Sequence, residues 1–297
     1  MKKITRLVHT FSKLLSFDSI ASKYGYMTLL RKFVPEPIEY KKPTIKYVKR
    51  NGVNFRLDVS DFMQWSIYAS VPDSSYKYAL NTLKRYADPV QVIDVGANVG
   101  AFCFSLAHEC QILGLDNINI YAFEPNPFIF KSLKSNARIN PDLAKMISFE
   151  SYALGDAVRT ANFTFSAENS GNGHIIVGND LNSFEVKMTT CDTFLAQQKQ
   201  LPVAFIKIDV EGFEPFVIDG ALSTIERCKP DLYIEITPNW YQERGRSVKL
   251  TFEYLLDMGY FISIDYEGVL KPIKSFDGNY PRQFNILASC CDIYFKL

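Results

Sequence analysis

Between residues 90 and 257, short apolar runs alternate with longer amphipathic segments, and this alternation restricts the fold more than any other feature of the chain. Each strand-like run is followed by a helix-like one: VQVIDVG by AFCFSLAHEC, INIYAFEP by PFIFKSLKSNARI, VAFIKIDVEG by PFVIDGALSTIERC, and DLYIEIT by VKLTFEYLLDMG. Such alternation is typical of a mainly parallel sheet covered on both faces. We predict an α/β fold with a doubly wound, mainly parallel sheet, whose ligands bind beyond the carboxyl ends of the strands.

The segments outside this alternation complete the outline. ISFESYALGD is predicted as one further strand, and YFISIDYEG with FNILASCCDIYF as a closing antiparallel pair. Residues 161–189 interrupt the alternation with two strand-like runs, ANFTFS and SFEVKMT, around a Gly/Asn-rich loop. Residues 35–50 contain three prolines and are typical of an extended linker. We divide the chain into a basic extension and linker, residues 1–50, and one α/β domain, residues 51–297.

The N-terminal extension is strongly basic. Residues 1–50 contain twelve Lys or Arg and three Asp or Glu, although the formal net charge of the whole chain is only +1. Within it, ITRLVHTFSKLLSF places apolar residues at helical spacing. Such a helix either packs on the protein's own core or a second subunit, or makes peripheral contact with an anionic membrane through residues 1–15. The near-neutral total charge argues against a general nucleic-acid binder.

Cysteine usage and hydropathy indicate the compartment. None of the six cysteines forms a CxxC pair, which favours reduced, mainly buried thiols over a disulfide framework or a zinc site. No stretch is apolar and long enough to span a bilayer, and the N-terminus lacks the uninterrupted apolar run of a signal peptide. We expect a cytoplasmic protein.

An acid-and-glycine turn ends the first strand of the alternating region. Asp94, Gly96, Asn98 and Gly100 stand between that strand and the next helix. Glycine lets a backbone approach a ligand closely, although the same spacing also suits tight packing. The pattern G-x-x-x-G lacks the third glycine of a dinucleotide site, and no P-loop follows. A cationic sulfonium ligand needs no phosphate cradle and tolerates the nearby Asp94.

Acidic residues also follow the second and third strands. Glu124, in FEPNP, stands where a carboxylate can accept hydrogen bonds from both hydroxyls of a ribose. Asp156, in YALGD, or the backbone beside it, is placed to meet an adenine edge, although Gly-Asp is also a common turn. The two positions together describe a nucleoside pocket.

The fourth strand ends in alternating ionisable residues. In IKIDVEG, Lys207, Asp209 and Glu211 share one face of the extended chain. Three ionisable groups on a central strand are costly unless they meet a cavity or pair with one another. Glu235, near the end of the fifth strand, adds an acid at the same edge of the sheet.

In combination these runs resemble the FkbM family of S-adenosylmethionine-dependent methyltransferases. The matching runs, in the family's order and spacing, are VIDVGANVGAF, YAFEPNPFIFKSLKSNARIN, YALGD, IKIDVEGFEPFVIDGA and PDLYIEITP. The resemblance covers about residues 53–290 and implies a class I methyltransferase fold with a seven-stranded sheet. The family mostly methylates hydroxyls of sugars, glycolipids and polyketides. The resemblance therefore implies an O-methyltransferase acting on a sugar, a glycan or a related metabolite.

The resemblance also implies where the cofactor S-adenosylmethionine binds. The implied cofactor-binding residues are Asp94, Gly96, Asn98 and Gly100 on the methionine side, Glu124 at the ribose, residues 153–156 (with Asp156) near the adenine, and Asp209 near the transferring methyl group. The insertion at residues 161–189 varies in the family, so the acceptor itself does not follow from the resemblance.

Methyl transfer to an alcohol is an in-line displacement that a base within hydrogen-bond reach accelerates by ~10²–10⁴-fold. Our first candidate is Asp209, because the end of the fourth strand faces the transferring methyl in this fold. His174 is the second, on a loop able to close over the substrate, and Glu211 and Glu235 are further candidates. Acids alone can bind Mg²⁺, but no dense acidic cluster is visible in the sequence, so we assign no metal.

Three other functions fit this fold less well. An NAD-dependent oxidoreductase is disfavoured by the missing third glycine. An RNA or protein-amide methyltransferase commonly shows an NPPY-like turn where this chain has DVEG. A non-catalytic binding module that kept the fold is disfavoured by the intact Asp94, Gly96, Glu124 and Asp209.

Overall fold

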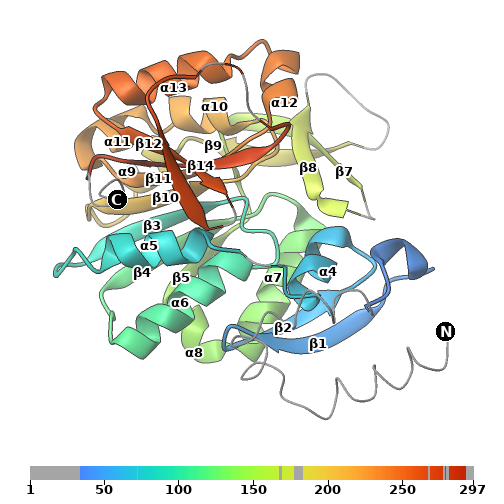
Figure 1. Cartoon of the computed structure of the whole chain (residues 1–297). Coiled ribbons are helices and arrows are strands. Elements are labelled where there is room, and N and C mark those ends of the chain that lie inside the picture. Colours follow the sequence, from blue (N-terminus) through green and yellow to red (C-terminus); the bar gives the residue numbers. More distant parts are fainter. Residues whose placement is uncertain are drawn as a thin grey trace.

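The computed structural model of the chain describes residues 34–71, 73–166, 169–176, 183–266, 268–276, 278 and 281–291. Its centre is a sheet with the strand order β13-β12-β14-β11-β10-β3-β4-β5 (Figure 1). The strands are β3 (Val90–Val95), β4 (Ile118–Phe123), β5 (Ile147–Glu150), β10 (Val203–Ile208), β11 (Asp231–Ile236), β12 (Phe261–Tyr266), β13 (Val269–Ile273) and β14 (Phe284–Ser289). The described residues thus give this sheet eight strands in place of the predicted seven, because β13 pairs with β12 and extends the edge.

The sheet is mainly parallel, as the alternation predicts. Strands β5, β4, β3, β10 and β11 run parallel, and β14, β12 and β13 run antiparallel to their neighbours. The predicted closing antiparallel pair is β12 and β14. Every residue of β3 and β10 is buried, which explains their nearly continuous apolar runs.

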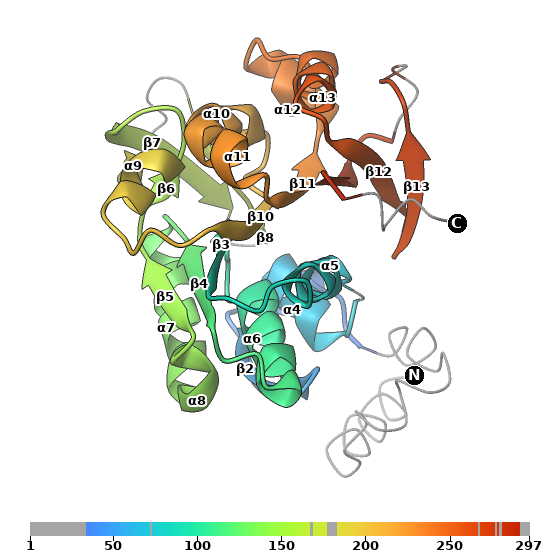
Figure 2. The ribbon, with the colours of Figure 1, turned by 90° about the vertical axis from the view of Figure 1, so that its left-hand side faces the viewer.

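Helices cover both faces of this sheet (Figures 1 and 2). One face carries α5 (Ser75–Leu83), α6 (Ala101–Leu113), α7 (Pro127–Ile139) and α8 (Pro141–Ala144); the other carries α9 (Cys191–Ala196), α10 (Glu214–Asp219), α11 (Leu222–Cys228), α12 (Pro238–Glu243) and α13 (Val248–Asp257). The helix predicted from PFVIDGALSTIERC is interrupted at Gly220, between α10 and α11. At that point the chain passes so close to Gly155 that a Cβ on Gly220 would lie 1.9 Å from the Gly155 carbonyl oxygen.

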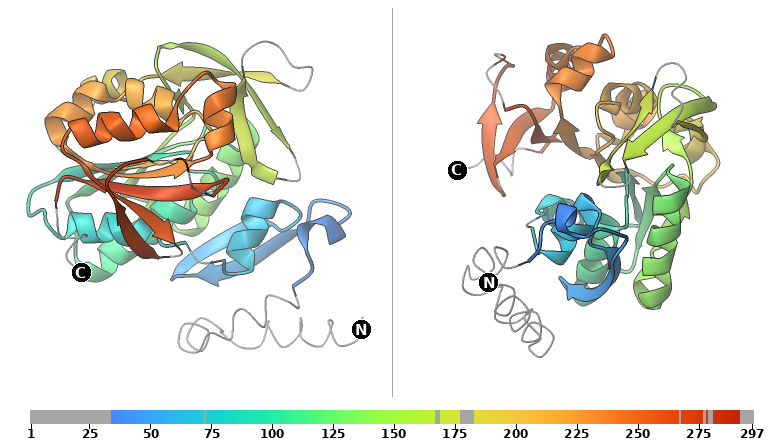
Figure 3. Two further views of the ribbon diagram at one scale, coloured as in Figure 1. Left: turned by 45° about the horizontal axis from the view of Figure 1, so that its top comes forward. Right: turned by 90° about the vertical axis from the view of Figure 1, so that its right-hand side faces the viewer.

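A second, four-stranded sheet lies at one end of the main sheet, in the order β6-β9-β7-β8 (Figure 3). Its strands are β6 (Ala153–Leu154), β7 (Arg159–Ser166), β8 (Asn169–Ile176) and β9 (Phe184–Thr189). ISFESYALGD, predicted as one strand, is therefore divided between the two sheets, as β5 and β6. The rest of the predicted Gly/Asn-rich loop falls outside the described residues, but residues 169–176 form strand β8, so the prediction is wrong there. The glycines of β8 allow close packing: a Cβ on Gly171 would lie 2.4 Å from the Met63 side chain.

The N-terminal part of the described chain packs on α7. It contains a short 3₁₀ helix η1 (Pro37–Glu39), the hairpin of β1 (Ile45–Arg50) and β2 (Val53–Asp58), and α4 (Phe62–Tyr68). Asn136 accepts the Arg56 N–H at 2.8 Å, and Asn140 accepts the Asn54 N–H at 3.0 Å, so α7 holds β2 by its backbone. Strand β1 lies within the segment predicted as an extended linker; it is extended, and it pairs with β2. The helix predicted within residues 1–15 falls outside the described residues.

The hydropathy of the described helices and the state of the cysteines agree with the sequence. No helix in the described part of the chain is long and apolar enough to cross a membrane. The six cysteines are free thiols, as the absence of CxxC pairs predicts, and Cys103, Cys110 and Cys191 are buried while Cys291 is exposed.

Candidate active site

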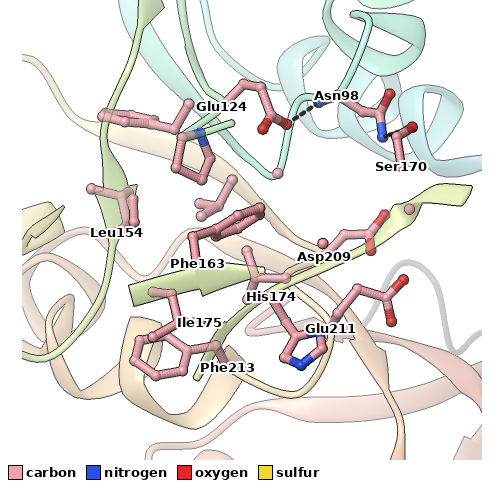
Figure 4. Close-up of a pocket in the computed structure, with 18 of the residues that line it drawn as sticks. Asn98, Glu124, Leu154, Phe163, Ser170, His174, Ile175, Asp209, Glu211 and Phe213 are labelled. Carbon is pink, nitrogen blue, oxygen red and sulfur yellow. Dashed lines mark hydrogen bonds between the residues drawn. The ribbon is translucent and has the colours of Figure 1, made fainter. Parts of the chain in front are cut away.

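A cavity opens at the carboxyl ends of β3, β4, β10 and β11, as expected for a doubly wound sheet (Figure 4). The cavity volume is about 120 Å³, and the cavity is partly open to solvent. Strands β7 and β8 supply one wall through Phe163, Ser170, His174 and Ile175. The cavity therefore combines the strand ends of the main sheet with strands β7 and β8 of the insertion, which the sequence alone could not place.

Glu124 lies directly after β4 and lines this cavity while only 6% exposed. One carboxylate oxygen accepts the Asn126 N–H at 2.8 Å, and the other accepts the Asn98 N–H at 3.0 Å. Burial raises the pKa of Glu124 to about 7, against the opposite effect of these two backbone donors. Each oxygen keeps lone-pair capacity, so the carboxylate is held rigidly and can still accept hydrogen bonds from two ligand hydroxyls.

The turn after β3 is tight because β3 and β10 meet there. Gly96 has φ +84°, and a Cβ on it would lie 1.9 Å from the backbone oxygen of Asp209. Asn98 is also left-handed, at φ +49°, and its side chain accepts the Val99 N–H at 2.8 Å. Gly96 and Asn98 both line the cavity, as predicted. Gly100 does not: a Cβ there would meet the Phe104 ring at 2.5 Å, so this glycine serves helix packing.

Asp94, predicted to bind cofactor, lies behind the cavity and is not among its lining residues. It is fully buried, and the Lys207 ammonium is 3.9 Å from its Oδ1. Burial raises the pKa of Asp94 to about 6. Lys207 lies 2.9 Å from Asp209, which is the ion pair that the sequence left open. Burial alone would lower the pKa of Lys207, but Asp209 and Asp94 outweigh it and raise that pKa.

Asp209, Glu211 and Glu235 come together at the cavity, with one ligand atom of each within 4.8 Å of the others. Burial opposes ionisation of Asp209, but Lys207 and a hydrogen bond with Glu235 lower its pKa below the usual value. Burial and the Asp209 charge raise the pKa of Glu211 to about 9 and that of Glu235 well above its usual range. Of the three acids, Asp209 is therefore the one most readily ionised.

The chain has the donor atoms for a divalent cation here, since three carboxyl groups within this distance suit Mg²⁺. The Lys207 ammonium lies 2.9 Å from Asp209, however, and this positive charge opposes the binding of a cation at that carboxylate.

The sequence missed Glu214, which holds the turn beside this cluster. Glu214 is 1% exposed, and its Oε1 accepts the Val210 N–H at 3.1 Å and the Gly212 N–H at 2.9 Å. Glu211 has φ +55° and Gly212 has φ +86°, so two consecutive left-handed residues form the turn. Glu214 thereby fixes the backbone that presents Asp209 and Glu211 to the cavity.

His174 lines the cavity from β8, and not from a loop as predicted. Its ring centroid lies 5.5 Å from that of Trp240 on α12, with the ring planes at 35°. Figure 4 shows His174 and Glu211 on the side of the cavity away from Glu124. The histidine is therefore held by regular strand geometry and aromatic contact.

The end of the cavity predicted to meet adenine is apolar. Ala153, Leu154 and Phe213 line it, with Tyr152 beside them. Asp156 is exposed, ion-paired with Arg159 at 3.3 Å, and does not line the cavity. Of the predicted residues 153–156, Ala153 and Leu154 of β6 line the cavity, whereas Gly155 and Asp156 do not.

Three further lining residues have no signal in the sequence: Met63 on α4, Ser170 on β8 and Gln283 before β14. Each belongs to a segment outside the strand–helix alternation. Only the packing of α4, β8 and β14 against the main sheet brings them to the cavity.

A family model described as the methyltransferase FkbM domain matches residues 94–262, more than half of the chain. No curated protein sequence matches the chain. Among solved structures, the chain is similar to a methyltransferase FkbM from Methylobacillus flagellatus KT, with 20% identity over 69% of this chain and 44% of that chain, at a TM-score of 0.45. The match thus spans less than half of that relative.

Other methyltransferases show similar likeness. A precorrin-6y C5,15-methyltransferase from Geobacter metallireducens GS-15 has 13% identity over 72% of this chain and 86% of its own, at a TM-score of 0.39. A Pyrococcus abyssi tRNA (uracil-54, C5)-methyltransferase, determined with S-adenosyl-L-homocysteine, has 12% identity over 82% of this chain and 43% of its own, at 0.39.

Proposed function

Because the chain belongs to the FkbM methyltransferase family and so uses S-adenosylmethionine, we propose that it methylates a hydroxyl oxygen of a sugar, a glycan or a related metabolite. The observation that carries the proposal is Asp209: a cavity-lining carboxylate kept ionised by Lys207 at 2.9 Å. An ionised carboxylate of this kind suits an alcohol acceptor, which must lose a proton when it is methylated.

The cavity fits the cofactor at three points. The rigid Glu124 carboxylate has free acceptor capacity for the two ribose hydroxyls. The backbone of Gly96, which has no side chain, and that of Asn98 border the space for the methionine part. Leu154 and Phe213 offer apolar surface to adenine. S-adenosylmethionine supplies a methyl group already activated by its sulfonium, so the protein mainly aligns the reactants.

Asp209 acts as the base in this proposal. The acceptor oxygen bonds to the methyl carbon while the carbon–sulfur bond breaks and its electron pair stays on sulfur. The hydroxyl proton becomes strongly acidic as the new bond forms, so even a carboxylate with a lowered pKa can accept it. Lys207 holds Asp209 in place at 2.9 Å, and Glu235 shares a hydrogen bond with it.

Other groups around the cavity suit a polyhydroxyl acceptor. The raised pKa values of Glu211 and Glu235 favour the protonated carboxyl, which donates as well as accepts hydrogen bonds, and His174 adds a ring nitrogen. Sugar hydroxyls also donate and accept, so several can pair at once. His174 remains the second candidate for the base.

The decisive experiment separates binding from turnover. Binding of S-adenosylmethionine is measured by isothermal titration, and turnover as release of S-adenosylhomocysteine with monosaccharides, nucleotide sugars and glycolipids as acceptors. Glu124→Ala should abolish binding, whereas Asp209→Asn should retain it and slow turnover by about 10²–10⁴-fold. Asp156→Asn, at an exposed acid away from the cavity, is the matched control and should change neither.

Three outcomes would count against the proposal. Full activity in Asp209→Asn would remove the base assignment. Unchanged binding in Glu124→Ala would remove the cofactor placement. Tight cofactor binding with no turnover on any acceptor would favour a non-catalytic binding module.

We also keep two proposals about partners. The acceptor is a small molecule or glycan and not a nucleic acid, and residues 1–15 make peripheral contact with anionic membranes. The second is tested by sedimentation with phosphatidylglycerol vesicles, comparing the intact chain with a variant in which Lys2, Lys3 and Arg6 are changed to Glu. Equal sedimentation would rule out the membrane contact.

A further inference from the structure

Three polar side chains from distant parts of the chain meet at one edge of the cavity. They are Asp61 at the N-terminus of α4, Ser170 on β8, and Asn98 in the turn after β3. The Ser170 hydroxyl donates to Asp61 Oδ1 at 3.0 Å, and the Ser170 N–H donates to Asp61 Oδ2. The Asn98 amide donates to the Ser170 hydroxyl at 3.4 Å (Figure 4).

The Asp61 and Ser170 side chains are buried, and both carboxylate oxygens of Asp61 accept hydrogen bonds. Asp61 is 4% exposed and Ser170 is 7% exposed. Asp61 Oδ1 also accepts the Gln64 N–H at 2.9 Å, which caps α4. A buried carboxylate is costly unless its oxygens are satisfied, and here three donors from two elements satisfy it.

The same contacts continue to the residue proposed to bind ribose. The backbone N–H of Asn98 donates to Glu124 at 3.0 Å, so a chain of bonds runs from Asp61 through Ser170 and Asn98 to Glu124. Packing supports it, since a Cβ on Gly171 would lie 2.4 Å from the Met63 side chain. Strand β8 is thus fastened to α4 directly beside the turn of the cofactor site.

We propose that Asp61 and Ser170 are positioning residues that lock β8 against the Asn98–Glu124 end of the cavity and thereby set the affinity for S-adenosylmethionine. The inference rests on the proposed placement of the cofactor at Glu124. Neither residue needs to touch the reacting atoms: they act by holding Asn98 and the wall of the cavity in the binding geometry.

The test is the dissociation constant of S-adenosylmethionine, measured by isothermal titration on the full chain. Ser170→Ala removes the hydroxyl that links Asp61 to Asn98 and should weaken binding about tenfold. Ser170→Thr restores a hydroxyl and should recover most of the affinity. Ser135→Ala is the matched control, because the Ser135 hydroxyl is exposed on α7 and bonds only to the Lys131 carbonyl; it should bind as the unmodified protein does.

A second variant keeps the inference testable if Ser170→Ala misfolds. Asp61→Ser preserves a capping hydroxyl for the Gln64 N–H but is too short to bridge to Ser170. It should also weaken binding about tenfold, and the double variant Asp61→Ser/Ser170→Ala should bind no more weakly than either single variant, because both remove the same link.

The outcomes separate this inference from the proposed function. If Glu124→Ala abolishes binding while Ser170→Ala and Asp61→Ser bind normally, the bridge has no positioning role and the inference is overturned alone. Additive losses in the double variant, or no recovery in Ser170→Thr, would also overturn it. If Glu124→Ala binds normally, the cofactor placement fails and the inference fails with it.

Discussion

Cofactor binding should strengthen as the pH rises through about 7, because Glu124 must be ionised to accept two ribose hydroxyls. Burial is the main reason that the pKa of this carboxyl is raised to about 7. Below that pH the group carries a proton and loses one acceptor position. Above it, both oxygens accept, and the Asn98 and Asn126 N–H groups hold them in place.

The expected size follows from the ionised fraction. With a pKa of about 7, roughly a tenth of Glu124 is ionised at pH 6 and roughly nine tenths at pH 8. The apparent dissociation constant equals the intrinsic constant divided by the binding-competent fraction. It should therefore fall about tenfold between pH 6 and pH 8.

The assay is isothermal titration with 5′-methylthioadenosine, which keeps the adenine and ribose but lacks the titrating amino-acid group of the cofactor. Asp94→Asn is the control, because Asp94 also titrates, with a pKa of about 6, yet does not line the cavity. The pH profile should persist in this variant, with a slightly lower midpoint, since the Asp94 charge helps to raise the pKa of Glu124. A dissociation constant that stays level from pH 6 to pH 8 would refute the reasoning. Loss of the pH dependence in Asp94→Asn would show that Asp94, and not Glu124, is the titrating group.

Three further predictions concern stability. Gly96→Ala should lower the free energy of unfolding, measured by urea denaturation, by at least about 1–3 kcal/mol. The φ of Gly96 is +84°, and a Cβ at this residue would clash with the backbone oxygen of Asp209. Unchanged stability would contradict that geometry. The unliganded protein should melt at a lower temperature at pH 9 than at pH 6. Burial raises the pKa of Glu214 to about 7 and that of Glu211 to about 9, so between pH 6 and pH 9 the folded state binds more protons than the unfolded state and loses stability as the pH rises. A higher melting temperature at pH 9 would disprove this prediction. Trp65→Phe should cost about 1–2 kcal/mol by removing the 2.8 Å bond from the indole N–H to the Pro35 carbonyl, and equal urea midpoints would show that this contact contributes nothing.

Local patterns predicted much of this protein because they report which residues face a core. Strand β10 and helix α7 were predicted from the alternation of apolar runs with amphipathic segments. Glu124 and Asp209 were placed at the cavity by one rule, that parallel strands end at the same edge of the sheet. The same rule brought Glu235 to Asp209 from the neighbouring strand.

The same patterns failed where a local signal has two meanings. The sequence does not distinguish a glycine that leaves room for a ligand from one that leaves room for a packed side chain. Gly100 leaves room for the Phe104 ring. A Gly/Asn-rich run is typical of a loop, but packing of β8 on Met63 and Phe163 favours glycine in a strand. Asp156 was predicted to end a strand, but β6 ends at Leu154, and the Asp156 side chain is exposed and paired with Arg159.

The strand–helix alternation of the main sheet, the edge at which its cavity lies and the acids Glu124, Asp209, Glu211 and Glu235 follow from short-range periodicity and from the polarity of parallel strands. Contacts between distant segments follow only from tertiary packing. Asp61 and Ser170 are 109 residues apart, and Ser170 and Asn98 are 72 apart, so their contact depends on how α4 and the second sheet pack together. Burial in the folded chain also raises the pKa values of Glu124, Glu211 and Glu235, and no local pattern of residues specifies that burial.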